Sequence, residues 1–313
     1  MIDVLINSLV PIFAVMGIGY FAGWIRDVDN RHVAELNALV MDFALPAALF
    51  VGTATTSRAV VIAQWPLLGT LVVSMLVLYG ISYAMQRYLF RLSLGEAAVQ
   101  TLTVALPNYV AGIPLVATLF GPSKTIYVAL AVAAGSIFPS PITLAILEAN
   151  KVAIAGQQST STIVGPIGRS LCKPIVLAPV VGILFSLVGV PLAPVVVDSF
   201  RLIGQSAGGV ALFLTGLILS GQNIVFSPNV ISGTLFKNVL HPLLAYGLIL
   251  LLPMSRGTAR AALLLVAIPS GFFSVLFGLR YGIESREAGS TLILSSLVSI
   301  VTLAIVLVLT AGW

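Results

Sequence analysis

Three side chains that could carry out acid–base or ionic chemistry, Asp42, Lys237 and His241, lie in stretches that are otherwise strongly apolar. Lys237 and His241 are four residues apart, so they would share one face of a helix. An ionisable group in an apolar medium is costly and is a functional candidate by default. The carboxylate could carry a proton, orient a ligand or bond to its own helix, whereas the lysine could attract an anion or neutralise carbonyl groups at a helix end.

A second candidate is the segment 106–114, where the sequence Leu-Pro-Asn-Tyr-Val-Ala-Gly-Ile-Pro interrupts another apolar stretch. A proline removes a backbone donor and clashes with the carbonyl group one turn earlier, so a helix would break here. The free N–H groups and the positive dipole at the start of the second half-helix favour a bound carboxylate. We therefore take Pro107, Asn108, Tyr109, Gly112 and Pro114 as candidate binding residues.

The composition is that of a polytopic membrane protein. Of the 313 residues 59% are hydrophobic and 8% are charged, and the mean hydropathy is +1.12, whereas a soluble protein carries roughly 25% charged residues. The single cysteine, Cys172, excludes an intramolecular disulfide, and the two histidines argue against a histidine metal site. No motif for a nucleophile, a phosphate loop or a nucleic-acid surface occurs, so we expect no enzyme activity, no cofactor and no nucleic-acid partner.

A helix needs about 20 apolar residues to cross roughly 30 Å of hydrocarbon. By that measure the fold class is all-α, and we predict ten spans at residues 4–25, 33–54, 65–89, 96–119, 124–148, 166–188, 200–221, 229–252, 258–279 and 287–311. A polar linker at 151–165 separates residues 1–150 from residues 166–313, with five spans in each half. Because five is odd, the second half enters the membrane in the opposite sense, as in transporters with inverted repeats.

The fourth span of each half is interrupted. In the second half the interruption is Ile268-Pro269-Ser270-Gly271, so Pro269, Ser270 and Gly271 join the candidate binding residues. Corresponding interruptions in the two halves of a transporter point to its binding site. Two kinked helices that bind no ligand are the alternative.

Basic residues predict the orientation because they favour the cytoplasmic side. The odd-numbered connections and their flanks hold nine, namely Arg26, Arg31, Arg87, Arg91, Lys151, Arg169, Lys173, Arg280 and Arg286. The even-numbered ones hold five, namely Arg58, Lys124, Arg201, Arg256 and Arg260. We therefore expect both termini outside the cytoplasm and the linker inside it. This orientation places Asp42 and Lys237 at comparable depth, where they could pair directly or face one cavity.

Several segments resemble motifs of the auxin efflux carrier family, which includes bacterial malonate carriers and plant auxin exporters. These segments are Asn37–Phe50, Lys237 with the pair His241-Pro242, Pro269-Ser270-Gly271, Arg280-Tyr281-Gly282 and Ser295–Ser299. The resemblance spans essentially the whole chain. Plant members have a crossover that contains Asn-Pro-Asn and often a long cytoplasmic loop, whereas this chain has Pro107-Asn108-Tyr109 and only the short linker.

The resemblance implies two inverted five-helix repeats in which helices 4 and 9 cross where they are broken. Helices 1, 2, 6 and 7 would form a scaffold that dimerises, and helices 3–5 and 8–10 would form a transport domain that moves like an elevator. The protein would be a multi-pass carrier of the bacterial cytoplasmic membrane for a small organic anion such as malonate.

The resemblance also assigns roles to the candidate residues. Asn108, Ser270 and the backbone around both breaks would hold the carboxylate. Lys237 would attract it electrostatically with His241 nearby, and Asp42 would tune or couple the cycle. Two alternatives stay open: an ion exchanger of the same fold in which Asp42 carries a proton or a sodium ion, and a membrane sensor or intramembrane enzyme that transports nothing.

Overall fold

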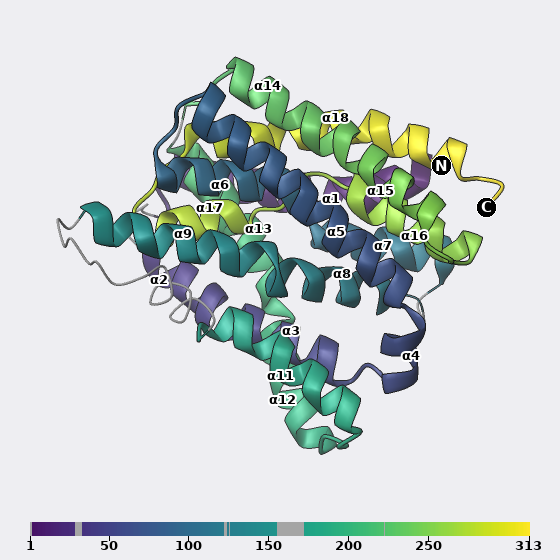
Figure 1. Ribbon diagram of the computed structural model, residues 1–313. Coiled ribbons are helices and arrows are strands. Elements are labelled where there is room, and N and C mark those ends of the chain that lie inside the picture. The colour runs from purple at the N-terminus through teal and green to yellow at the C-terminus, as the bar shows by residue number, and fades with distance from the viewer. Residues whose placement is uncertain (1, 29–32, 122–123, 125, 155–171, 222) are drawn as a thin grey trace.

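The computed structural model describes residues 2–28, 33–121, 124, 126–154, 172–221 and 223–313 (Figure 1). These residues form helices and no strand, which confirms the predicted all-α class. Six of the described helices are long and apolar enough to cross a membrane, namely Val33–Ala54, Trp65–Leu89, Ile126–Ala153, Pro194–Ser220, Pro228–Leu251 and Arg286–Leu309. The division into ten spans and two inverted repeats stays a prediction.

The first half of the chain consists of α-helices and two π-helical segments. They are α1 (Ile2–Trp24), α2 (Val33–Ala38), the π-helix η2 (Leu39–Ala44), α3 (Leu45–Ala54), α4 (Arg58–Ala63), α5 (Trp65–Ala84), the π-helix η3 (Met85–Leu89), α6 (Leu94–Ala105), α7 (Tyr109–Phe120), α8 (Ile126–Ile137) and α9 (Pro139–Ile154). The last of these continues beyond the predicted end at 148, so Lys151 lies in its last turn. Arg31, His32, Arg169 and residues 155–165 of the predicted linker lie outside the described residues.

The second half likewise consists of α-helices and one π-helical segment. Its helices are α11 (Pro174–Val188), α12 (Pro194–Gly204), α13 (Ser206–Ser220), α14 (Pro228–Leu235), the π-helix η5 (Phe236–Leu240), α15 (His241–Leu251), α16 (Arg256–Ala267), α17 (Phe273–Arg280) and α18 (Arg286–Leu309). The span predicted from residue 200 begins earlier, at Pro194, because a proline fits the first turn of a helix. The start predicted at residue 166 lies outside the described residues, and the described helix begins at Pro174.

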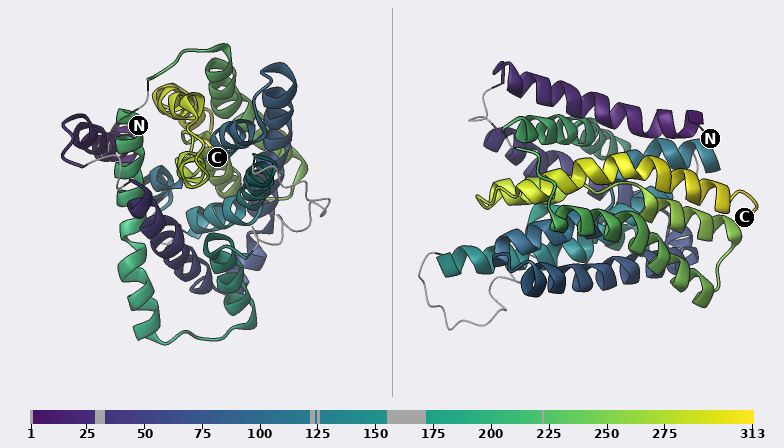
Figure 2. Two further views of the ribbon diagram at one scale, coloured as in Figure 1. Left: turned by 90° about the vertical axis from the view of Figure 1, so that its left-hand side faces the viewer. Right: turned by 90° about the horizontal axis from the view of Figure 1, so that it is seen from above.

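The helices pack in two groups. In one group α1 packs along α13, while α11 and α12 pack on α3. In the other group α6 contacts α5, α9 and α17, and α15 contacts α5 and α16, while α14 and α16 contact α18. The groups touch where α1 meets α7, where α8 meets α3 and α11, and where α17 meets α2. The start of α1 and the end of α18 lie at the same end of the molecule (Figure 2).

Glycines allow α1 and α13 to approach closely. A Cβ atom on Gly19 would lie 2.0 Å from the carbonyl oxygen of Phe213, and one on Gly216 would lie 1.9 Å from that of Met16. Small residues of this kind let membrane helices pack backbone to backbone. The first group of helices therefore depends on these two positions.

We expect Gly19→Ala to lower the thermal melting temperature of the purified protein, because overpacking of this kind destabilises by about 1–3 kcal/mol. Gly17→Ala is the matched control in the same helix, since a Cβ atom there meets nothing within 4 Å. Equal melting temperatures for the two variants would contradict the close α1–α13 contact.

Candidate functional site

The break between α6 and α7 follows from its prolines and from the way the chain is capped. Ser93 and Glu96 form a capping box that starts α6, which ends at Ala105. Leu106 is extended, Pro107 has no N–H group to continue the helix, and Asn108 precedes the first turn of α7 without capping it through its side chain. Pro114 lies inside α7, so the second proline of the segment does not end the helix.

The break between α16 and α17 has the same form. Ile268, the first residue after α16, is extended with φ −61° and ψ 155°, and helix resumes at Phe273. Residues next to a proline are pushed toward extended conformations, which explains why Ile268 leaves the helix. Each break therefore exposes the carbonyl end of one half-helix and the N–H end of the next.

The two breaks meet as a short antiparallel bridge between Pro107 and Ser270. The N–H group of Asn108 donates to the carbonyl oxygen of Pro269 over 2.8 Å, and that of Gly271 donates to the carbonyl oxygen of Leu106 over 2.7 Å. We call this pair of segments, 106–108 and 268–272, the crossover. The structure thus brings together Pro107, Asn108, Pro269, Ser270 and Gly271.

Several backbone N–H groups that were candidates for binding a carboxylate already have partners in the structure. The N–H groups of Asn108 and Gly271 serve the bridge, and that of Ser270 donates to Oγ of Ser295 over 3.0 Å. Two side-chain oxygens remain, Oδ1 of Asn108 and Oγ of Ser270, which are buried and have no partner in the described part of the chain. Buried polar atoms nearly always have a partner, so these two atoms call for an explanation.

Ser295 and Asn238 form a hydrogen-bonded pair that contacts the crossover through the N–H group of Ser270. The hydroxyl of Ser295 donates to Oδ1 of Asn238 over 2.7 Å, and the amide of Asn238 donates back to the carbonyl oxygen of Ser295 over 3.0 Å. A second link joins the two breaks on their other side, where Thr103 donates to Ser274 over 2.6 Å. Ser295 belongs to the serine-rich segment Ser295–Ser299 that resembles a family motif, but the spacing of these serines does not indicate this contact.

Lys237 and His241 lie at the carbonyl end of α16. The ammonium of Lys237 donates to the carbonyl oxygen of Val266 over 2.7 Å and lies 3.2 Å from Nδ1 of His241. Nε2 of His241 is 3.4 Å from the hydroxyl of Ser74. Both side chains are fully buried. Of the roles considered for Lys237, neutralising the carbonyl groups at a half-helix end is the one that matches these contacts.

The structure does not pair Asp42 with Lys237. Oδ1 of Asp42 instead accepts a hydrogen bond from Nη1 of Arg280 over 2.6 Å, and the two side chains are 26% and 33% exposed. The sequence could not suggest this pair because Arg280 lies in a predicted connection, far from Asp42 along the chain. Of the two arrangements considered for Asp42 and Lys237, direct pairing is therefore excluded.

Both Asp42 and Lys237 lie in π-helical turns, η2 and η5. Each turn is followed by a proline, Pro46 or Pro242, that cannot donate to the carbonyl group four residues earlier. The widened turn is the local response to that missing bond. π-helical turns recur at functional sites in other proteins, and here they contain both deeply placed candidates.

A cavity of about 620 Å³ adjoins the crossover between α3, α7, α8 and α13. Phe272 of the crossover and Tyr109, the first residue of α7, line it on one side, and Gln205 lines it from the junction of α12 and α13. The hydroxyls of the other two polar side chains in the wall have partners, since Thr53 bonds to the carbonyl oxygen of Leu49 and Tyr109 to the sulfur of Met75. Gly112 does not line this cavity, and a Cβ atom there would touch Leu265, Ile268 and Val128.

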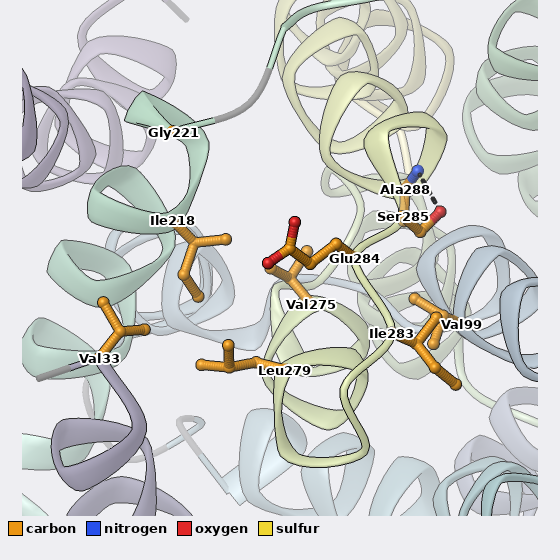
Figure 3. Close-up of a pocket in the computed structure, with 10 residues that line it drawn as sticks. All are labelled: Val33, Val99, Ile218, Gly221, Val275, Leu279, Ile283, Glu284, Ser285 and Ala288. Carbon is orange, nitrogen blue, oxygen red and sulfur yellow. Dashed lines mark hydrogen bonds between the residues drawn. The ribbon is translucent and has the colours of Figure 1, made fainter. Parts of the chain in front are cut away.

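A smaller pocket of about 120 Å³ lies away from the crossover, between α13 and α17 (Figure 3). Val33, Ile218 and Gly221 line one side of it, and Leu279 and Glu284 line the other. Glu284 extends its carboxylate toward α13, as Figure 3 shows. No group of three or more histidine, cysteine or acidic side chains that could hold a metal ion occurs in the described part of the chain.

Known proteins resemble this chain over nearly its whole length. Residues 4–307 match the family model described as "Membrane transport protein". The chain is 29% identical over 308 residues to "Uncharacterized transporter YfdV" of Escherichia coli (strain K12), and the match covers 96% of each chain. It is 24% identical over 304 residues to "Putative malonate transporter" of Rhizobium meliloti (strain 1021), with 94% of this chain and 92% of that protein covered.

Proposed function

Since the chain belongs to the membrane transport protein family, the family of the auxin efflux carriers, we propose that it is a secondary carrier for an organic carboxylate. One observation carries this proposal: at the crossover the side-chain oxygens of Asn108 and Ser270 are buried without a partner. A carboxylate at this place accepts from the Ser270 hydroxyl, and it pairs Asn108 once the amide turns its NH2 end toward the ligand, since the amide oxygen itself can only accept. The adjoining cavity of about 620 Å³ gives the rest of the ligand room.

The chemistry of the crossover suits a carboxylate. The N–H groups of the first two residues of α7 and of α17 have no partner within their own helices, whereas those of Ala111 and Val275 donate to the residue before each helix. Both turns are the positive ends of helix dipoles. Tyr109 and Phe273 begin these turns. The amide of Asn108 and the hydroxyl of Ser270 can each donate a further hydrogen bond. A carboxylate has enough lone pairs to accept from several of these donors at once.

Two classes of carboxylate are candidates. Malonate is favoured by the name of the relative from Rhizobium meliloti. A monocarboxylate with an apolar body is favoured by the cavity wall, where Leu45, Val110 and Phe272 are typical residues and the amide of Gln205 has no partner in the described chain. A second carboxylate group against such a wall would lose its hydration without compensation.

The mechanism that we propose is an elevator. Residues 1–150 and 166–313 form inverted five-helix repeats, helices 1, 2, 6 and 7 form a dimerising scaffold, and the remaining helices carry the crossover across the bacterial cytoplasmic membrane. Both termini lie outside the cytoplasm. The division of the packing into two groups supports the scaffold, and the common end of the two termini supports an even number of spans. The alternative of an ion exchanger receives less support, because Asp42 is bonded to Arg280.

The test is direct binding of malonate and hexanoate to the purified protein, followed by the variant Asn108→Ala. We expect one of the two ligands to bind and the variant to bind it at least about tenfold more weakly, since a hydrogen bond to a charged group contributes about 1.5–3 kcal/mol. Isothermal titration calorimetry measures both affinities.

The fold of the variant should be preserved, because the side chain of Asn108 makes no hydrogen bond within the described residues. Asn223→Ala, at an exposed residue of the connection before α14, is the matched control and should bind as the wild type does. Unchanged affinity in Asn108→Ala would refute the site. Failure of both ligands to bind the wild type would refute the carboxylate assignment.

A further inference from the structure

The end of α17 is fastened to α2 and η2 at the end of the molecule away from the termini (Figure 1). The amide of Asn37 donates to the carbonyl oxygen of Leu276 over 2.9 Å, and this contact is buried. One turn later Arg280 donates to Asp42 over 2.6 Å. These contacts join helices of the first packing group to one half of the crossover helix pair.

The next residue is fastened as well. Tyr281 donates to Oε1 of Glu148 over 2.6 Å, and the same oxygen lies 3.0 Å from the ammonium of Lys173. That ammonium also lies 5.2 Å from the centre of the Tyr281 ring. Since Glu148 belongs to α9 and Lys173 immediately precedes α11, these contacts also cross from one packing group to the other.

On the side of the crossover formed by α7, a cavity takes the place of such contacts. There α7 faces the junction of α12 and α13 across the cavity of about 620 Å³. The residues in its wall include Val110 and Ile113 on α7 and Gly204, Gln205 and Gly208 on the far side. No ion pair joins the residues that line this cavity. One half-helix, α17, is thus fastened by charge, while the other, α7, has no such pair to α13 and only packs Val110 beside Gly208, where a Cβ atom would lie 3.3 Å from that valine.

We propose that the ion pair between Asp42 and Arg280 is a conformational latch that holds the carrier with its cavity open toward the termini. The inference rests on the proposed function, because an alternating carrier must open its site to each side in turn. If α17 moves with the crossover past η2, this pair must break. The pair is only partly exposed, so its attraction is screened less than that of a surface pair.

Among the described residues no ion pair joins α7 to α12 or α13, so we find no counterpart of the latch there. Gln205 lies at the irregular point of its helix, as Asp42 does in η2, but it is uncharged and faces the cavity without a partner in the described chain. The ligand-free carrier therefore rests in the observed state. Loss of the latch shifts the population toward the state in which α7 closes onto α12 and α13 and the cavity is lost.

A cysteine reporter tests this shift without any ligand. Cys172→Ser removes the only cysteine of the chain, and Gln205→Cys then places one thiol in the cavity wall. The rate at which a water-soluble methanethiosulfonate reagent modifies this thiol reports how often the cavity is open. We expect Asp42→Asn and Arg280→Gln to slow the modification by up to about fivefold, the largest factor by which an ion pair of modest strength changes the equilibrium between the two states.

Two further variants make the result specific. The exchange Asp42→Arg with Arg280→Asp should restore the wild-type rate, because it recreates the pair with reversed charges. Asp198→Asn is the matched control, since it removes another Asp–Arg pair, with Arg201 at 3.2 Å, from an exposed face of α12. This control should leave the rate unchanged.

Wild-type rates in both single variants, or equal slowing in Asp198→Asn, would overturn the latch. The outcome is separate from that of the binding test. A protein that binds neither malonate nor hexanoate but shows the predicted rates would lose the carboxylate assignment and keep the latch. A protein that binds one of these ligands but shows wild-type rates in the variants would keep the carboxylate assignment and lose the latch.

Discussion

Gly271→Val is expected to reduce both carboxylate binding and uptake to background. A Cβ atom at this position would lie 2.9 Å from the carbonyl oxygen of Pro107 and 3.0 Å from that of Leu106. Both are backbone atoms, and the second also accepts the hydrogen bond from the Gly271 N–H group. The side chain can fit only if the antiparallel bridge opens. Overpacking of about 1–3 kcal/mol is then added to the loss of two buried hydrogen bonds.

Uptake into proteoliposomes and calorimetric binding measure the effect of Gly271→Val. Gly247→Val in α15 is the control, because a Cβ atom there meets nothing within 4 Å. The control should transport as the wild type does. Binding of the carboxylate to Gly271→Val with wild-type affinity would show that the bridge is not needed for the site.

The sequence predicts the crossover well because its signals are local. Pro107 and Pro269 remove backbone donors where they stand, and no distant residue can replace a missing N–H group. The sequence indicates Gly271 only as a neighbour of the break, and the structure adds the reason for a glycine there: the opposing backbone is too close for a side chain. The apolar stretches likewise predict the all-α class, although only six of the described helices are long and apolar enough to cross a membrane.

The partners of the charged residues could not be predicted in this way. Asp42 and Lys237 have comparable depth in the expected topology, but depth says nothing about the direction in which a side chain points. Their actual partners, Arg280 and the carbonyl group of Val266, depend on how the half-helices turn after each break. The π-helical turns that contain both residues shift the faces of their helices, and a regular helical period does not anticipate such a shift.

The position of Lys237 changes what its charge can do. Its ammonium binds the carbonyl oxygen of Val266, which lies at the carbonyl end of α16 three residues before the crossover proline Pro269, and the lysine is fully buried. A cation at this end of a helix opposes the negative end of the dipole. Lys237 is therefore better suited to hold the end of α16, and with it Pro269 and Ser270, than to touch a ligand in the cavity.

Lys237→Met is accordingly expected to lower uptake at least about tenfold. Methionine fills similar space but cannot donate, so the carbonyl group of Val266 and Nδ1 of His241 both lose a donor, and each buried acceptor left unpaired costs about 1–3 kcal/mol. Uptake into proteoliposomes gives KM and kcat. Lys124→Met is the matched control, because Lys124 is exposed and lies over the ring of Tyr127.

The split between the two constants separates positioning from attraction. If Lys237 acts on the ligand through its charge, Lys237→Arg keeps KM and Lys237→Met raises it with kcat unchanged. If Lys237 instead holds the end of α16, Lys237→Met lowers kcat as well, because the crossover is displaced in every state of the cycle. Lys237→Arg then restores uptake only as far as the larger guanidinium fits the buried site. Wild-type constants in Lys237→Met would mean that the end of α16 needs no cation and that the crossover is fixed by its own bridge and by Ser295.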